Sequence, residues 1–184
     1  MADKMPGATL EAIAARQMNA NLTIREFRRA DFQRLWEIDQ KCFAPGVSYS
    51  QPELLFYMRR PRAFTLVAER IVPGNGLGTI TAAEIVGFIV AEAGRQTGHI
   101  ITIDVLPDAR RGGLGSRLMM EAEQRLRAAG CSAVMLETAV DNDSALAFYK
   151  RHHYFLVKTI PRYYATGVDA FLLKKNLSMV GVSG

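Results

Sequence analysis

The fold of this chain is decided by one stretch, Val105-Leu106-Pro107-Asp108-Ala109-Arg110-Arg111-Gly112-Gly113-Leu114-Gly115-Ser116-Arg117. The alternating, β-branched residues 99–105 are typical of a strand, and the apolar spacing over residues 114–129 is typical of a helix. Pro107 ends the strand, and the glycines fall where a tight turn must lead into the helix. Such a turn directs backbone N–H groups and the positive end of the helix dipole into one small volume, which suits a phosphate or pyrophosphate.

Two well-known phosphate-binding loops do not fit this stretch. A P-loop requires lysine after its last glycine, but Gly115 is followed by Ser116. A dinucleotide-binding loop requires a further glycine three residues later, which residues 116–118 do not supply. The remaining pattern is Arg-x-x-Gly-x-Gly, formed by Arg110, Gly113 and Gly115. Its plain alternative is a glycine-rich turn that binds no ligand.

Composition sets the outer limits of the interpretation. The chain has 184 residues, of which 49% are hydrophobic, and this composition predicts one globular domain, at residues 21–176. We expect residues 1–20 to be an N-terminal extension, helical or disordered, and residues 177–184 to be a flexible tail. We find no apolar run near the ~20 residues of a membrane span and no secretory signal, so we expect a cytoplasmic protein without membrane contact. The cysteines, Cys42 and Cys131, are expected to be free thiols, and we expect no metal site. The net charge of +5 suits a polyanionic cofactor but decides nothing alone.

The order of secondary structure predicts an α/β (α+β) fold with a mixed sheet and helices on both faces. The strand at 133–138 is rich in Val, Met and Leu, so it is expected to be central and buried on both faces. Asp31 is expected to cap the first helix, and Ser50 to cap the second. The predicted helices are 31–42, 51–60, 114–129 and 145–152, and the predicted strands are 22–27, 63–69, 84–92, 98–105, 133–138, 154–160 and 170–174.

Two residues after the phosphate loop are candidates for acid–base chemistry. Glu137 stands near the end of an otherwise apolar strand, where a lone carboxylate is costly to bury unless it is paired or functional. Burial would raise its pKa toward neutrality, as a general base requires. Tyr149 lies about two turns into the next helix and can project back toward the same strand end. The plain alternatives are an arginine partner for Glu137 and a core-packing role for Tyr149.

The loop and the run from Glu137 to Phe155 together resemble the GNAT superfamily of acyl-CoA-dependent N-acetyltransferases, in particular the RimI-type N-alpha-acetyltransferases. The resemblance implies a mostly antiparallel central sheet of about seven strands and acetyl-CoA as the cofactor. It implies that Glu137 is the base, Tyr149 the acid and Asn142 a cofactor ligand. Together with Asn142, the cofactor-binding residues that it implies are Ile103, Asp104, Val105, Arg110, Arg111, Gly112, Gly113, Leu114, Gly115 and Ser116.

Two positions depart from that family's pattern. His152-His153-Tyr154 stands where relatives usually have Leu-Gly-Phe, so the glycine that would turn the helix end is missing. Asp104 is a charged residue within the strand before the loop, and it is a rival to Glu137 as base because some branches of the family place their base on that strand.

The acceptor is indicated by a third segment. Tyr163 and Tyr164, followed by Gly167-Val168-Asp169-Ala170, resemble the loop with which protein N-terminal acetyltransferases hold the acceptor peptide. At pH ~7.4 an α-amine (pKa ~7.8) is about one-quarter neutral, whereas a lysine (pKa ~10.4) is neutral in about one molecule in a thousand. We therefore predict direct acetyl transfer, without an acyl-enzyme, to the α-amine of a protein or peptide N-terminus. A small amine or lysine as acceptor, or a CoA-binding module without catalysis, remains the alternative; nucleic acid is not expected as a partner, and either a monomer or a homodimer is compatible with the sequence.

Overall fold

The computed structural model describes residues 22–72 and 82–177. The predicted extension at 1–20, all but the first residue of the predicted tail, and the glycine-rich connection at 73–78 lie outside the described residues. Seven strands form one sheet in the order β1-β2-β3-β4-β5-β7-β6, and every neighbouring pair is antiparallel except β4 with β5. The prediction of a mixed, mostly antiparallel sheet of about seven strands is confirmed.

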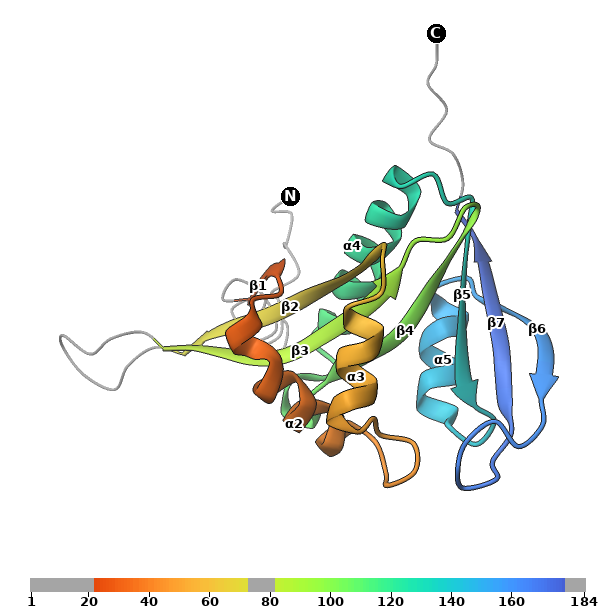
Figure 1. The fold of residues 1–184 in the computed structure, drawn as a ribbon, viewed down its shortest axis with the longest axis horizontal. Helices are drawn as coiled ribbons and strands as arrows, with labels where there is room; N and C mark the ends of the chain where they lie inside the picture. Colours follow the sequence, from red (N-terminus) through yellow and green to blue (C-terminus); the bar gives the residue numbers. More distant parts are fainter. Residues whose placement is uncertain (1–21, 73–81, 178–184) are drawn as a thin grey trace, which may run out of the picture.

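The elements follow the predicted order closely. The strands are β1 (Leu22–Glu26), β2 (Ala63–Val72), β3 (Ala82–Glu92), β4 (Thr97–Val105), β5 (Ala133–Ala139), β6 (Phe155–Ile160) and β7 (Ala170–Asn176). The α-helices are α2 (Phe32–Cys42), α3 (Gln51–Met58), α4 (Leu114–Ala128) and α5 (Asp143–Arg151), with short 3-10 turns η1 (Arg29–Asp31) and η2 (Pro107–Ala109). Helices α2 and α3 cover one face of the sheet, and α4 and α5 lie on the other, as Figure 1 shows.

Local sequence explains where these helices begin and which side they bury. The Ser50 hydroxyl accepts from the Glu53 backbone N–H while the Glu53 carboxylate accepts from the Ser50 N–H, so the predicted capping of α3 is confirmed. Helix α4 buries the apolar stripe that its spacing predicts against β2, β3, β4 and β5, namely Leu114, Leu118, Met119, Ala122 and Leu126.

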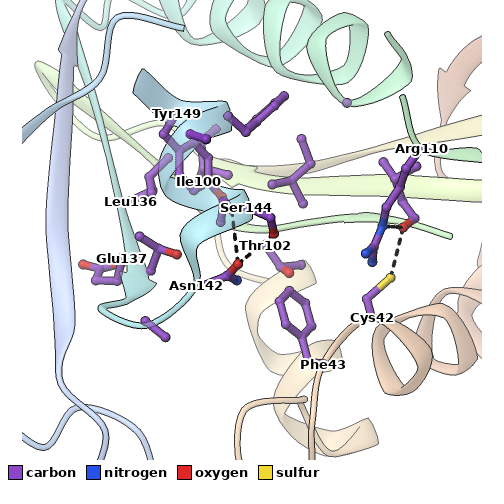
Figure 2. Close-up of a pocket in the computed structure, with 18 of the residues that line it drawn as sticks. Cys42, Phe43, Ile100, Thr102, Arg110, Leu136, Glu137, Asn142, Ser144 and Tyr149 are labelled. Atoms are coloured by element: carbon purple, nitrogen blue, oxygen red, sulfur yellow. Dashed lines mark hydrogen bonds between the residues drawn. The ribbon is translucent and has the colours of Figure 1, made fainter. Parts of the chain in front are cut away.

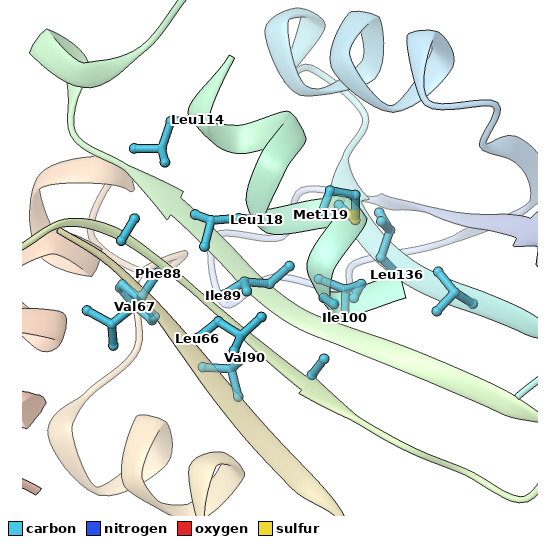
Figure 3. Close-up of a cluster of buried hydrophobic side chains, with 14 of the residues drawn as sticks. Leu66, Val67, Phe88, Ile89, Val90, Ile100, Leu114, Leu118, Met119 and Leu136 are labelled. Carbon is cyan, nitrogen blue, oxygen red and sulfur yellow. The ribbon is translucent and has the colours of Figure 1, made fainter. Parts of the chain in front are cut away.

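The hydrophobic core lies on both sides of β3 (Figure 3). Phe88, Ile89, Val90 and Ala91 are consecutive and all fully buried, because helices cover this part of the sheet from both sides. Each large apolar side chain buried in this way contributes about 1.5–3 kcal/mol. The expectation that residues 133–138 are buried on both faces is wrong: in β5 the exposure alternates, and only one of its faces is fully covered.

The feature that positions the site is the divergence of β4 and β5. These two parallel strands pair at three positions, Thr97–Ala133, Gly98–Val134 and His99–Met135, and then separate. The separation is visible in Figure 1, where β4 and β5 start side by side and spread apart. In β4, Ile101 is an extra residue between the pairs Ala91–Ile100 and Val90–Thr102 with β3, which is a β-bulge.

The bulge changes which side chains of β4 face which helix layer. Before it, Gly98 faces Leu126 of α4; after it, Val105 packs close to Gly115 at the start of α4. Gly98 and Val105 therefore face the same side of the sheet, although they are seven residues apart and a regular strand would place them on opposite sides. As a result Asp104 faces the opposite side, where α2 lies.

Candidate active site

A cavity of about 780 Å³ occupies the gap between β4 and β5. Its lining comes from five places in the fold: the second half of β4, the loop and first turn of α4, the end of β5 with α5, the connection from α2 to α3, and the connection from β6 to β7. Figure 2 shows Glu137, Leu136 and Tyr149 at one end of the cavity and Arg110 and Cys42 at the other. The gap between the two parallel strands thus brings residues from distant parts of the sequence into one cavity.

The loop before α4 has the properties of a phosphate cradle. Gly113 is the N-cap of α4 with φ 81°, and no side chain caps the helix, so its first N–H groups are free of side-chain partners. A Cβ placed on Gly112 or Gly113 would meet nothing within 4 Å, which leaves the backbone open to a ligand. The Arg110 Nε–H donates to the Val105 carbonyl over 2.8 Å and holds this arginine beside the strand end. The geometry thus fits the pyrophosphate of a coenzyme A.

The remaining predicted cofactor residues occupy unequal positions. Ile103, Val105, Arg110, Arg111, Gly113, Leu114, Gly115, Ser116 and Asn142 line the cavity, whereas Gly112 and Asp104 are outside its lining. The Asn142 side-chain oxygen accepts from the Ala145 N–H over 3.1 Å and caps α5. Its amide –NH₂ is the group left to donate into the cavity.

Glu137 lines the cavity and has a histidine partner. Its Oε2 lies 2.6 Å from Nε2 of His99, on the neighbouring strand, where the β4–β5 ladder ends. The expected alternative of an arginine partner is therefore wrong. His99 was not identified from the sequence; the signal that could have found it is its place on the less covered face of its strand, in a pattern where alternate residues are buried.

Tyr149 approaches the cavity from the opposite face of the sheet. It is 8% exposed, packs edge-on against Phe148 and Tyr154, and still lines the cavity. Burial, with a contribution from the nearby Asp104 carboxylate, raises the pKa of the Tyr149 hydroxyl well above its ordinary value. The tyrosine is thus held in its protonated form, as a proton donor must be.

The structure places Asp104 beneath α2 rather than in the cavity. Its side chain is 1% exposed, and the Thr102 hydroxyl donates to its Oδ1 over 3.1 Å. Burial and the neighbouring carboxylate of Asp39 raise the pKa of Asp104 well above its ordinary range. A base must reach the reacting amine, and Asp104, unlike Glu137, is not among the residues that line the cavity.

The two predicted acceptor tyrosines lie beside Glu137. Tyr164 lines the cavity, and the ring of Tyr163 packs edge-on against it at 5.1 Å between centroids. Burial and the negative charge of Glu137 raise the pKa of both tyrosines to about 12. Tyr49, from the α2–α3 connection, adds a third ring, and its hydroxyl donates to the Ile101 carbonyl over 3.4 Å.

Two further findings concern the described part of the chain only. Within residues 22–72 and 82–177, no group of three or more His, Cys, Asp or Glu side chains is placed to hold a metal ion. Among the helices of that part, none is long and apolar enough to cross a bilayer. Cys42 and Cys131 are free thiols, and the Cys42 Sγ–H donates to the Val105 carbonyl.

Comparison with known proteins gives consistent matches. The model of the acetyltransferase (GNAT) family matches residues 32–154. An uncharacterised N-acetyltransferase of Methanocaldococcus jannaschii is 31% identical over 156 residues, which is 84% of this chain and 91% of that protein. The N-alpha-acetyltransferase MAK3 of Arabidopsis thaliana is 40% identical over 93 residues, 48% of this chain and 49% of the plant protein. The crystal structure of Ard1 from Thermoplasma volcanium superimposes with a TM-score of 0.73 at 28% identity, covering 86% of this chain and 99% of that one.

Proposed function

The chain belongs to the acetyltransferase (GNAT) family, an acetyl-CoA-dependent family of acyltransferases, and from that premise we propose that its acceptor is the α-amine of a protein or peptide N-terminus. The observation that carries the proposal is the position of Glu137, which lines the cavity, contacts His99 and lies beside Tyr163 and Tyr164. The carboxylate that takes the proton and two aromatic rings thus lie together, where the backbone of the acceptor peptide would enter the cavity.

The donor is held by the loop and by the gap between the strands. Acetyl-CoA supplies the acetyl group as a thioester. The N–H groups at the start of α4, together with Arg110 and Arg111, bind its pyrophosphate, and the Asn142 amide donates from the opposite wall. Beyond His99, the edge of β4 that faces β5 is unpaired, so its backbone N–H groups are directed into the cavity and polarise the acetyl carbonyl.

The His99–Glu137 pair accepts the proton of the attacking amine. A carboxylate only accepts hydrogen bonds, so His99 Nε2–H donates and holds one carboxylate oxygen in place. The second oxygen is left to take a proton, directly or through water. An α-amine is already about one-quarter neutral at pH ~7.4, so a modest base suffices, whereas a lysine needs a far stronger one.

Tyr149 returns a proton to the leaving thiolate from the other side of the cavity. Its raised pKa keeps the hydroxyl protonated at neutral pH, so no prior activation is needed. Because Glu137 and Tyr149 approach from opposite faces of the sheet, one can accept a proton while the other donates without competing for the same space. No cysteine is required, since transfer is direct.

Within the family, the finer assignment is to the RimI-type and related N-alpha-acetyltransferases that act in the cytoplasm. It is supported by the run from Glu137 to Phe155, by the tyrosine pair, and by relatives that carry the name N-alpha-acetyltransferase. The plant relative is matched over about half of its length, so its activity supports a proposal about this chain and no more.

The test is thiol release from acetyl-CoA with a matched panel of acceptors. Each peptide is used with a free and with a blocked N-terminus, and the panel includes an N-blocked peptide with one lysine and several small amines. We expect turnover with free N-termini and none with their blocked counterparts. Equal turnover with the lysine peptide, or turnover with small amines alone, would overturn the acceptor assignment while leaving the acetyltransferase activity intact.

A further inference from the structure

Two buried carboxyl groups lie near each other where α2 packs against β4, and neither lines the cavity. Asp39 of α2 is fully buried and Asp104 of β4 is 1% exposed. Cys42, one turn after Asp39 on the same face of α2, contacts the Val105 carbonyl, so this face of the helix lies against the end of β4. Each carboxyl has one oxygen with hydrogen-bond partners and one buried oxygen without any: Asp39 Oδ1 and Asp104 Oδ2.

The partners of the other two oxygens lead to opposite walls of the cavity. Asp104 Oδ1 accepts from the hydroxyl of Thr102, which lines the β4 side. Asp39 Oδ2 accepts from the backbone N–H of Tyr49 over 2.9 Å and from the Gln40 amide, and Tyr49 lines the acceptor side. A hydrogen bond between the two unpartnered oxygens would connect these two sets of contacts.

We propose that Asp39 and Asp104 are positioning residues that share one proton: Asp104 Oδ2–H donates to Asp39 Oδ1 and so fixes the Tyr49 wall of the acceptor site to β4. One proton satisfies both orphaned oxygens, whereas two ionised carboxylates in this position repel each other and leave both oxygens unsatisfied. The proton is held by Asp104, because Asp39 receives two N–H donors that favour its charged form.

The electrostatics of the surroundings agree with this assignment. Burial raises the pKa of Asp39 to about 6, and the pKa of Asp104 lies well above its ordinary range because of burial and the Asp39 charge. Both shifts favour retention of a proton by this pair. The titratable and charged groups that face the pair from the neighbouring elements are Cys42, Tyr49, Arg110 and Tyr149.

The decisive measurement detects the protonated carboxyl group directly and does not depend on which amine accepts the acetyl group. The carboxyl carbons of ¹³C-aspartate-labelled full-length protein are followed by NMR as a function of pH. We expect one aspartate with the chemical shift of a protonated acid at neutral pH, and its absence in Asp104→Asn. If every aspartate is ionised at neutral pH, or if the acid signal persists in Asp104→Asn, the proposal is wrong.

Kinetics test the positioning role and rest on the proposed acceptor. In Asp39→Asn the side chain keeps a single oxygen, which cannot accept hydrogen bonds both from Asp104 and from the N–H groups of Tyr49 and Gln40. We therefore expect the KM for the acetyl acceptor to rise roughly tenfold and the acetyl-CoA KM to stay unchanged. In Asp104→Asn the side-chain –NH₂ can donate to Asp39 at every pH, whereas the wild type loses the shared proton as the pH rises. The acceptor KM of Asp104→Asn divided by the acceptor KM of the wild type should therefore fall with increasing pH. Glu37→Gln, an exposed carboxylate of the same helix, is the control and should change neither quantity.

A ratio that stays constant with pH, or an Asp104→Asn defect as large as that of Asp39→Asn, would contradict the positioning role even if the NMR result holds. If N-terminal peptides are not acceptors at all, the NMR result is unaffected and the kinetic comparison is made with the acceptor that the panel identifies. Failure of the shared proton and failure of the proposed function are thereby distinguished.

Discussion

His99 Nε2 and Glu137 Oε2 lie 2.6 Å apart, just beyond the last paired position of β4 and β5, which is His99–Met135. The contact joins the two strands just before they separate, so the carboxylate is fixed at the start of the cavity rather than on a mobile side chain. Because Nε2 carries the hydrogen in this contact, Nδ1 is the nitrogen of His99 that is left to accept a proton.

Replacing Glu137 with glutamine should abolish the proton acceptor while preserving the shape of the side chain. We expect kcat to fall by about 10²–10³-fold and acetyl-CoA binding to persist, because the phosphate loop is untouched. His99→Asn, which removes only the partner, should cause a smaller loss. Steady-state thiol release gives kcat, and a wild-type value for Glu137→Gln would refute its assignment as base.

Tyr149→Phe should lower kcat by about 10–10²-fold, since the leaving thiolate would take its proton from water. Burial raises the pKa of this hydroxyl, so the proton is retained above the ordinary tyrosine value. Activity of the wild type should therefore show no alkaline fall up to about pH 10. A pH profile of kcat with a descending limb well below that point would contradict the role of Tyr149 as acid.

Gly113→Ala should be more harmful than Gly112→Ala, although neither new methyl group would meet any atom within 4 Å. Gly113 has φ 81°, where a residue with a Cβ costs about 1–2 kcal/mol, whereas Gly112 has no such requirement. We expect Gly113→Ala to lower Tm and to raise the acetyl-CoA KM, both measurable beside Gly112→Ala. Equal effects would mean that the backbone angle is not what this glycine provides.

Tyr163→Ala should raise the KM for the acceptor peptide roughly tenfold, because an aromatic anchor commonly contributes more than 1 kcal/mol to binding. The acetyl-CoA KM should not change, since this residue is outside the cofactor loop. Phe56→Ala on α3 is the matched control, as this ring is 64% exposed and lies apart from the cavity lining. A peptide KM that moves equally in both variants would remove Tyr163 from the acceptor site.

His153→Gly should stabilise the protein. His153 turns the chain at the end of α5 with φ 65°, in the place where glycine is usual, and its side chain is exposed. Relief of that strain is worth about 1 kcal/mol, or about 2–4 °C in Tm for a domain of this size. Thermal unfolding measures the shift, and His153→Ala, which keeps a Cβ, should show no gain.

Features encoded by neighbouring residues could be predicted from the sequence. The buried stripe of α4 and the capping of α3 depend on spacings of three and four residues, and both are confirmed. Asp31 is the N-cap residue of α2, as predicted, but its side chain does not bond the helix, because the carboxylate pairs with Arg25 of β1 and accepts from the Arg28 N–H. The ion pair with the Arg25 guanidinium, six residues away in the sequence, thus replaces the local capping hydrogen bond that the sequence predicts.

Features that depend on how distant strands meet could not be predicted. The register of β4 against β5 brings His99 to Glu137 across 38 residues of sequence, and no local pattern fixes that register. The burial of Asp104 under α2 follows from a bulge at Ile101, which reverses the alternation on which a strand prediction relies. The uncovered face of β5 likewise follows from where α2 and α3 end, not from its own apolar residues.

The short ladder between β4 and β5 has a thermodynamic consequence. Three residue pairs form the seam between a four-stranded portion of the sheet and a three-stranded one, and beyond it two backbone edges face open space. A molecule bound along both edges bridges the two portions and is lost when they part, so its binding energy adds to the energy of unfolding. At a hundred times its Kd, such a ligand contributes about 2.7 kcal/mol. If acetyl-CoA binds along both edges, as proposed, the Tm of the enzyme should rise with the acetyl-CoA concentration.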